Sequence, residues 1–170
     1  VAAAMATAEA AQTLAGSSVG SVNAIRLDHT NLHTIGSGAA VDWVSGVGYH
    51  SIPATGYPGL SGSVDLPDHW ATYGVLLAWI DPAAAPAGTF RMRWDAAALT
   101  AGSVATVVPG LAEADLTPSA QNIVKVSTLA TGLSVGSDRS VYFRVFRDQS
   151  VVGNSADPFG LLAVTLIKSS

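Results

Sequence analysis

The chain has 170 residues, of which 49% are hydrophobic and 12% are charged, and its net charge is −4. This length suits one domain with a short arm, and so low a share of charge is common in proteins that belong to an assembly. The eight Lys and Arg residues are scattered and no apolar run approaches the roughly 18 residues of a membrane span. We therefore expect neither a nucleic-acid nor a membrane partner, and the lack of cysteine excludes disulfides and thiolate chemistry.

Residues 1–22 are predicted to be an arm outside the main domain, which is then residues 23–170. The first 15 residues are rich in Ala and other good helix formers, which favours a short helix. A Gly- and Ser-rich stretch follows and is typical of a flexible joint. A low-complexity arm becomes ordered when a partner holds it. We expect this arm to act as an anchor through its larger apolar residues, Met5, Leu14 and Val19.

Beyond the arm, short apolar runs alternate with turn residues, a pattern typical of an all-β sandwich or barrel. In TFRMRW, residues 89–94, Phe90, Met92 and Trp94 share one face, which predicts a half-buried strand. YGVLLAWI, residues 73–80, is apolar on both faces and is predicted to be a central strand or one at a subunit interface. The Pro-rich segment between these two runs is predicted to be a turn or short loop.

The C-terminal half contains four further apolar runs. Residues 103–108 and 123–129 are predicted strands, and 109–120 between them is predicted to be a loop with one helical turn. VYFRVFR, residues 141–147, and LLAVTLI, residues 161–167, are predicted to be antiparallel neighbours joined by a turn-rich loop. With the earlier runs, this predicts an all-β jelly-roll β-sandwich of about eight antiparallel strands.

Several short motifs contain residue types that catalysis or metal binding uses. Gly16 to Gly20 match G-x-S-x-G, but a nucleophile elbow needs a strand before it and a helix after it, and here a helix-prone run precedes it. Asp28-His29 with His33 permits a zinc pair, although solvated or hydrogen-bonded histidines are favoured. Most acidic residues sit beside Pro or Gly, where Asp bonds its own backbone. The prediction is therefore no catalytic residue, no metal, no cofactor and no enzyme activity.

The stretch GVGYHSIPATGYPGLSG, residues 46–62, is predicted to be a long loop because it is rich in Gly and Pro. Loops on a rigid sandwich are where binding sites are commonly found. Tyr49, His50 and Tyr57 are therefore the candidates for an outward binding loop, and a structural loop is the alternative. A sugar-stacking platform is also compatible with the aromatic residues, although Trp79 and Trp94 fit core positions of strands. Its candidates are Trp43, Trp70, Trp79 and Trp94 with Tyr49, Tyr57 and Tyr73.

The chain resembles a group of tailed-phage virion proteins with a C-terminal jelly-roll domain, over roughly residues 22–168. The segments that carry the resemblance occur in the order IRLDHTNLHTI, LPDHWATYGVLLAWI, GTFRMRW, YFRVFRD and FGLLAVTL. Ala163 stands where that family often has Gly, and the loop with Asn154 and Asp157 is poorer in Thr and Asp than is usual there. These departures leave a ligand site in that loop open.

This resemblance implies a homotrimer on the virion surface, on the capsid or on the tail, without enzyme activity. The partners it implies are further copies of the chain and the major capsid protein or another virion protein. The trimer contact is expected on strand faces that the core leaves free. Its candidate residues are Leu76, Ala78, Phe146 and Leu161.

The sequence supports two functions ahead of a third. The first is a capsid decoration or cement protein, in which the knob faces outward and the arm of residues 1–22 holds the shell. The alternative is a tail-fibre or spike module that binds a host surface glycan, since jelly rolls serve lectins as well as capsids. An enzyme such as a glycanase comes third, because no motif stands in a supporting context.

Overall fold

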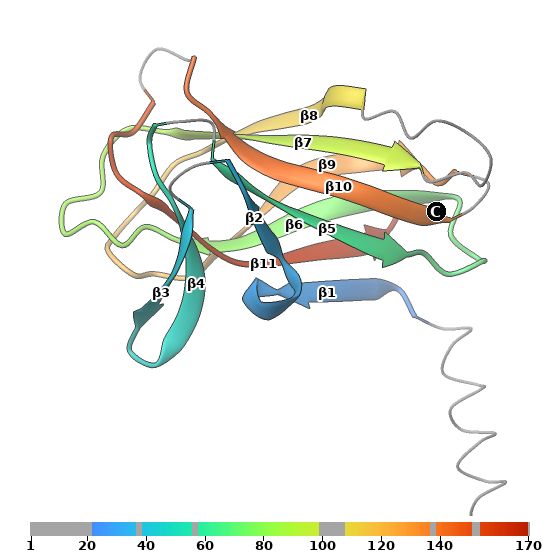
Figure 1. Cartoon of the computed structure of the whole chain (residues 1–170), viewed down its shortest axis with the longest axis horizontal. Coiled ribbons are helices and arrows are strands. Elements are labelled where there is room, and N and C mark those ends of the chain that lie inside the picture. The colour runs from blue at the N-terminus through green and yellow to red at the C-terminus, as the bar shows by residue number, and fades with distance from the viewer. Residues whose placement is uncertain are drawn as a thin grey trace, which may run out of the picture.

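The structure is a computed structural model that describes residues 22–36, 39–55, 58–98, 108–136, 139–150 and 154–169. These residues form eleven β-strands and one short 3₁₀ helix, η1 (Figure 1). None of them forms a helix long and apolar enough to cross a membrane. In chain order the elements are β1 (Ala24–Asp28), η1 (His29–Asn31), β2 (His33–Ile35), β3 (Ala40–Val44), β4 (Val47–Ile52), β5 (Gly59–Asp65), β6 (Thr72–Ile80), β7 (Phe90–Ala98), β8 (Val108–Leu116), β9 (Lys125–Ser134), β10 (Ser140–Asp148) and β11 (Phe159–Lys168).

The strands form two antiparallel sheets that pack face to face as a jelly-roll β-sandwich. One sheet has the order β3-β4-β11-β6-β9, with β1 also paired to β11, and we call it the β11 sheet. The other has the order β2-β5-β10-β7-β8, and we call it the β10 sheet. The fold class predicted from the sequence is confirmed. β6 lies between β11 and β9, as its two apolar faces predicted.

The core lies between the two sheets and confirms the predicted inward faces. Phe90, Met92 and Trp94 of β7 are all fully buried. From the opposite sheet, Trp79 and Phe159 each meet the Phe90 ring edge-on, with ring centroids 5.8 and 5.2 Å away. Full burial of a large apolar side chain stabilises a fold by about 1.5–3 kcal/mol, so these rings join the two sheets firmly.

The last two strands are not neighbours, which corrects the prediction made for them. β10 pairs with β5 and β7, whereas β11 pairs with β4, β6 and β1. The two strands therefore belong to different sheets, and their apolar faces meet across the core. A chain that crosses from one sheet to the other buries the same residues as a hairpin would, so the hydrophobic pattern alone does not separate the two arrangements.

The segment predicted as a loop at 109–120 is mostly strand, because β8 runs to Leu116. Ala112 and Ala114 pack against the core, while Glu113 and Asp115 pair with Arg side chains of β7. Small residues kept the alternation from standing out in the sequence. The predicted count of about eight strands is exceeded mainly because short strands also form between residues 33 and 65.

β11 changes partner along one of its edges, and this change shapes the surface described below. Phe159–Leu161 pair with β4, and Ala163–Ile167 pair with β1. Between them the register against β6 shifts, so Leu162 is the extra residue of a β-bulge. Because side chains alternate along a strand, the bulge puts Leu161 in the core and Leu162 on the outer face.

Candidate functional site

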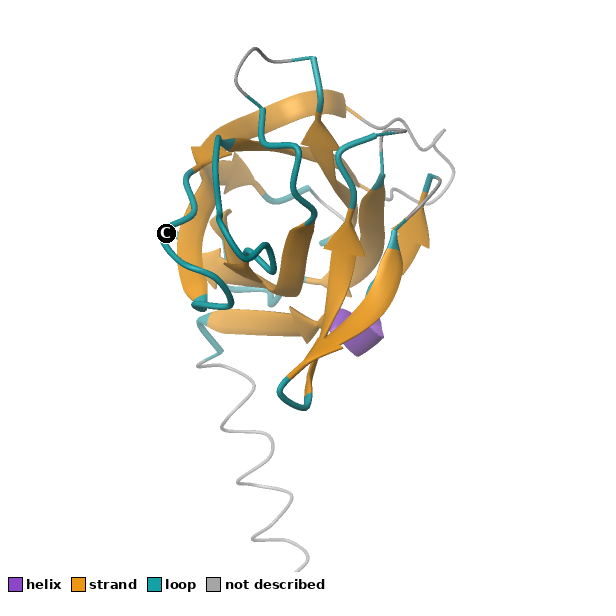
Figure 2. Cartoon of the chain, turned by 90° about the vertical axis from the view of Figure 1, so that its left-hand side faces the viewer, coloured by secondary structure: helices purple, strands orange, loops and turns teal. Residues whose placement is uncertain are grey.

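The β3–β4 hairpin projects beyond the body of the sandwich, at the lower left of Figure 1, and lies beside η1 in Figure 2. Its strands are joined by Ser45 and Gly46, whose φ angles of 50° and 81° are the positive values that a two-residue turn of this kind requires. Trp43 is 63% exposed, and Val41 and Val47 are about half exposed. The hairpin therefore exposes apolar side chains, Val41 and Trp43 on one face and Val47 on the other, and exposed apolar groups of this size often mark binding surfaces.

His29 of η1 supports the exposed indole from one side. The imidazole meets the Trp43 ring edge-on, with centroids 5.9 Å apart and an interplanar angle of 82°. Gly48 is the cross-strand partner of Trp43. A Cβ at Gly48 would lie 2.5 Å from His29 Nε2 and 3.0 Å from the Trp43 ring. The glycine therefore allows both rings to approach the hairpin backbone.

Hydrogen bonds hold η1 between the end of β1 and the hairpin. Asp28 Oδ1 accepts from Thr30 N at 3.0 Å and from Thr30 Oγ1 at 2.6 Å. These bonds lower the pKa of the Asp28 carboxyl, which favours its charged form. His50 Nε2 lies 2.7 Å from the His29 carbonyl oxygen. Burial lowers the pKa of His50, so a neutral imidazole donates to that carbonyl.

A hollow of about 480 Å³ lies on the outer face of the β11 sheet, beside the hairpin. Its polar lining residues are Arg26, Asp28 and His29. Its apolar lining residues are Trp43, Val47, Val124 and Leu162, and Gly46 and Gly48 complete the lining. Four separate parts of the chain meet here: β1 with η1, the hairpin, the segment just before β9, and β11 through Leu162.

A second hollow of about 130 Å³ adjoins the first, because Val47, Val124 and Leu162 line both. The remaining lining includes Asn122 and Ile80. Small-molecule sites are concave, mainly apolar and equipped with a few polar groups that orient the ligand. The joined hollows have this composition, and they suit a ligand with one apolar face and several hydrogen-bonding groups.

The predicted outward loop is corrected by the structure, because Tyr49 and His50 lie in β4 and are each 3% exposed. Tyr49 donates from its hydroxyl to Asp42 Oδ2 at 3.1 Å. Its ring lies over Gly160, where a Cβ would come within 3.0 Å of Tyr49 Cδ2. Both residues thus support the hairpin from within. Tyr57 lies outside the described residues.

The four predicted interface residues do not share a surface. Leu76 and Ala78 lie on the outer face of the β11 sheet, half-buried and buried respectively. Phe146 lies on the opposite outer face, where the Arg93 guanidinium stands 5.3 Å from its ring centroid. Leu161 is fully buried in the core of its own chain, which corrects its assignment to a free face. The bulge at Leu162 is the physical reason.

Two site predictions remain, the anchor in the N-terminal arm and the pair of histidines for a zinc ion. The anchor candidates Met5, Leu14 and Val19 lie outside the described residues, as does the arm up to residue 21. His29 and His33 fall in different elements, η1 and β2. Among the residues that the structure describes, no three His, Asp or Glu side chains gather as a metal site would require.

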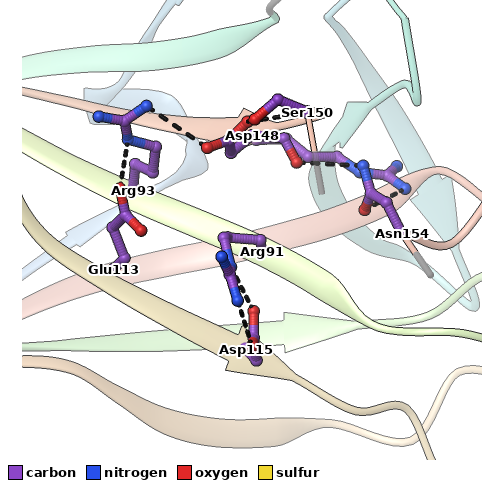
Figure 3. Close-up of polar contacts among 8 residues, drawn as sticks. Arg91, Arg93, Glu113, Asp115, Asp148, Ser150 and Asn154 are labelled. Atoms are coloured by element: carbon purple, nitrogen blue, oxygen red, sulfur yellow. Dashed lines mark hydrogen bonds and ion pairs between the residues drawn. The ribbon is translucent and has the colours of Figure 1, made fainter. Parts of the chain in front are cut away.

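The outer face of the β10 sheet differs in kind from the hollow. Arg91 pairs with Asp115 through two bonds of 2.6 and 2.7 Å, and Arg93 contacts Glu113 and Asp148 at 3.0 and 3.4 Å (Figure 3). These arginines come from β7, and their partners come from the neighbouring strands. The charges of this face are therefore matched within the chain.

The loop between β10 and β11, which the sequence left open as a ligand site, is filled by Arg147. This side chain is fully buried, and burial lowers its pKa. It donates to the backbone oxygens of Asp157 and Ser155 and to Asn154 Oδ1. Its guanidinium also stands 4.9 Å from the Phe90 ring centroid. The described residues of this loop are therefore held by a side chain of the protein itself.

The hollow residues could be found from the sequence only in part. The sequence suits Trp43 to a sugar-stacking platform, but no local pattern indicates that its ring is exposed. Ser45-Gly46 between alternating apolar residues was the signal for a projecting hairpin. Arg26 and Val124 carry no local signal, because their role depends on what lies beside them in space.

Comparison with solved structures finds carbohydrate-binding modules. A family 35 carbohydrate-binding module from Clostridium thermocellum matches with a TM-score of 0.54 and 10% identity, over 85% of this chain and 98% of that chain. The CBM22-2 xylan-binding domain of Paenibacillus barcinonensis Xyn10C matches with a TM-score of 0.52 and 14% identity, over 85% and 98%.

Some of these neighbours are parts of enzymes. The Podospora anserina GH26-CBM35 β-(1,4)-mannanase matches with a TM-score of 0.50 and 12% identity, over 87% of this chain and 28% of that chain. At these identities the likeness shows the jelly-roll fold alone. No protein-family model matches this chain, and neither does any curated protein.

Proposed function

We propose that the protein is a non-catalytic glycan-binding module and that it binds sugar in the hollow beside Trp43. The observation that carries the proposal is the exposed Trp43 indole, held by His29 beside a hollow that polar residues also line. A pyranose has an apolar face that packs on an aromatic ring and hydroxyls that need hydrogen-bond partners. The lining of the hollow supplies both kinds of contact.

The structural neighbours support this proposal through their fold. The modules from Clostridium thermocellum and Paenibacillus barcinonensis each align over 98% of their own length. The second is described as a xylan-binding domain. A sandwich of this architecture thus carries carbohydrate binding elsewhere, and the hollow offers a place for it here.

The test is a glycan array probed with the full chain and with Trp43→Ala. We expect binding to fall at least about tenfold in this variant, since aromatic anchors dominate such sites. The free energy of unfolding should change by no more than about 1 kcal/mol, because the ring is mostly exposed. Leu111→Ala is the control, since Leu111 is an exposed apolar residue of the β10 sheet. Equal binding by all three proteins would refute the assignment of the site.

A location on a virion surface is a second proposal. It is supported by the segments that resemble tailed-phage virion proteins and follow one another along the chain in the same order. In that setting the module is either a receptor-binding part of the tail or a trimeric capsid decoration protein. The decoration role requires a trimer and binding to undecorated capsids that is lost when residues 1–15 are deleted. Mass measurement in solution and co-sedimentation with capsids test these two requirements. A stable monomer that ignores capsids would remove the decoration role.

A further inference from the structure

The lining of the hollow contains one guanidinium that no other described side chain binds. Arg26 has no ion pair or hydrogen bond through its side chain within the described residues. The other arginines are engaged. Arg91, Arg93 and Arg144 pair with carboxylates, Arg139 contacts Asp68 and backbone oxygens, and Arg147 binds the last loop.

The register of β1 places Arg26 on the outer face of the β11 sheet. Arg26 pairs with Thr165, whereas its neighbours Ile25 and Leu27 point into the core. Arg26 therefore lies on the same side as Leu162, whose side chain forms part of the hollow. The guanidinium and the Trp43 indole line the same hollow from different strands.

Asp28 is the one acidic residue that lines the hollow, and its carboxylate is already partly engaged within the chain. Its Oδ1 accepts two hydrogen bonds from Thr30. No ion pair joins Asp28 and Arg26, and neither side chain forms one with any other described residue. The hollow thus holds one uncompensated guanidinium next to a carboxylate that is held by its own helix cap.

We propose that the hollow selects a sugar that bears an anionic group, a carboxylate or a sulfate ester, and that Arg26 binds this group while Trp43 packs on the ring. The proposal rests on the glycan-binding function proposed above. A guanidinium presents a planar fork of N–H donors that matches two oxygens of an anion. The protein has a net charge of −4. An arginine that has no anionic partner in the chain can pair with an anionic ligand.

The test compares neutral, uronate-, sialate- and sulfate-containing oligosaccharides on one array, probed with the full chain. We expect the anionic glycans to be retained best, and added salt to weaken them because partly exposed charges are screened. The uronates are then methyl-esterified, which removes the charge and keeps the sugar and its linkage. Esterification should weaken binding about tenfold, the size expected for a charge-assisted hydrogen bond near a surface.

Three variants assign the effect to Arg26. Arg26→Gln should abolish the preference for the charged glycan over its ester, and Arg26→Lys should restore part of it. Asp28→Asn should strengthen binding of the anion slightly, since Asn can still cap η1. Arg91→Gln is the control, because it removes the same charge from the opposite outer face.

The outcomes separate this inference from the function on which it rests. Binding that depends on Trp43 but is equal for charged and esterified glycans would overturn the anionic preference and leave the glycan site standing. A preference that survives Arg26→Gln would overturn the role of Arg26. No binding to any glycan on the array would overturn both proposals.

Discussion

The two outer faces of the sandwich differ in how their polar groups are used. On the outer face of the β10 sheet, Arg91, Arg93 and Arg144 alternate with inward apolar residues, and each pairs with a carboxylate on a neighbouring strand. On the β11 sheet, the outer face is apolar around Ile80 and Leu162, and Arg26 at its margin has no side-chain partner among the described residues. The arginines on the outer face of the β10 sheet have partners within the chain. The outer face of the β11 sheet has an arginine and apolar side chains that a ligand can contact.

This difference explains why the hollow, and not the charged face, is the better candidate site. A ligand at Arg91 would have to displace a carboxylate held by two short bonds. A ligand at Arg26 has no such competitor and gains apolar contact with Trp43 as well. Charged residues by themselves are therefore a poor guide to binding, and unmatched ones are more informative.

The largest expected effect concerns a buried carboxylate of the β10 sheet. Arg144 donates to Asp95 Oδ2 at 2.5 Å, and the Asp95 side chain is only 1% exposed. Arg144→Met should lower the free energy of unfolding by about 2 kcal/mol, since a buried charge loses its charged partner. Arg26→Met, on the other face, should change it by less than about 0.5 kcal/mol. Chemical denaturation measures both, and equal losses would contradict the distinction between the faces.

A smaller effect is expected at the tight packing beneath the hairpin. A Cβ at Gly160 would lie 2.6 Å from Ile80 Cγ1 and 3.0 Å from Tyr49 Cδ2. Gly160→Ala should therefore cost about 1–2 kcal/mol of stability through overpacking. A double-mutant cycle with Ile80→Ala should show that the two changes are coupled by more than about 0.5 kcal/mol. Additive losses would mean that the added methyl group is accommodated elsewhere.

The pH dependence of the charged face gives a third comparison. Asp148 Oδ1 accepts from Ser150 N and Oγ, and mainly these bonds lower the pKa of its carboxyl. Because the folded pKa lies below the unfolded one, this stabilisation is present above about pH 4 and is lost as pH falls through the folded pKa. Its size should be about 1 kcal/mol, the usual net contribution of hydrogen bonds to a folded protein.

Ser150→Ala isolates this contribution. The variant should raise the Asp148 pKa toward its ordinary value, as measured by NMR titration of the carboxyl carbon. It should also shrink the loss of stability between neutral pH and pH 2. An unchanged Asp148 titration would show that Arg93, and not Ser150, sets the pKa.

The smallest effects should map the border of the hollow. Val124 and Val126 are 61% and 65% exposed, but only Val124 lines the hollows. Val124→Ser should weaken glycan binding about threefold, the order expected for partial loss of one apolar contact. Val126→Thr should leave binding unchanged, and both should keep the unfolding free energy within about 0.5 kcal/mol. A loss in Val126→Thr would extend the site along β9.

Sequence reasoning predicted the fold class but only part of the site. The inward faces of β7 and β10 followed from strict alternation, as in Phe90, Met92 and Trp94. The stretch with Tyr49 and His50 was assigned to a loop because Gly and Pro surround it, yet its apolar residues pack under the hairpin. In this stretch tertiary packing overrode a local preference for turns.

The sequence by itself determined that this chain forms strands with two kinds of face, because the period of a strand is short and local. It also determined the low share of charged residues. Only the tertiary structure decided which strands pair, where β11 carries its bulge, and that Arg26, Trp43 and Val124 meet around one hollow. Those contacts join residues far apart in the chain, and their register is set by the packing of the whole sandwich.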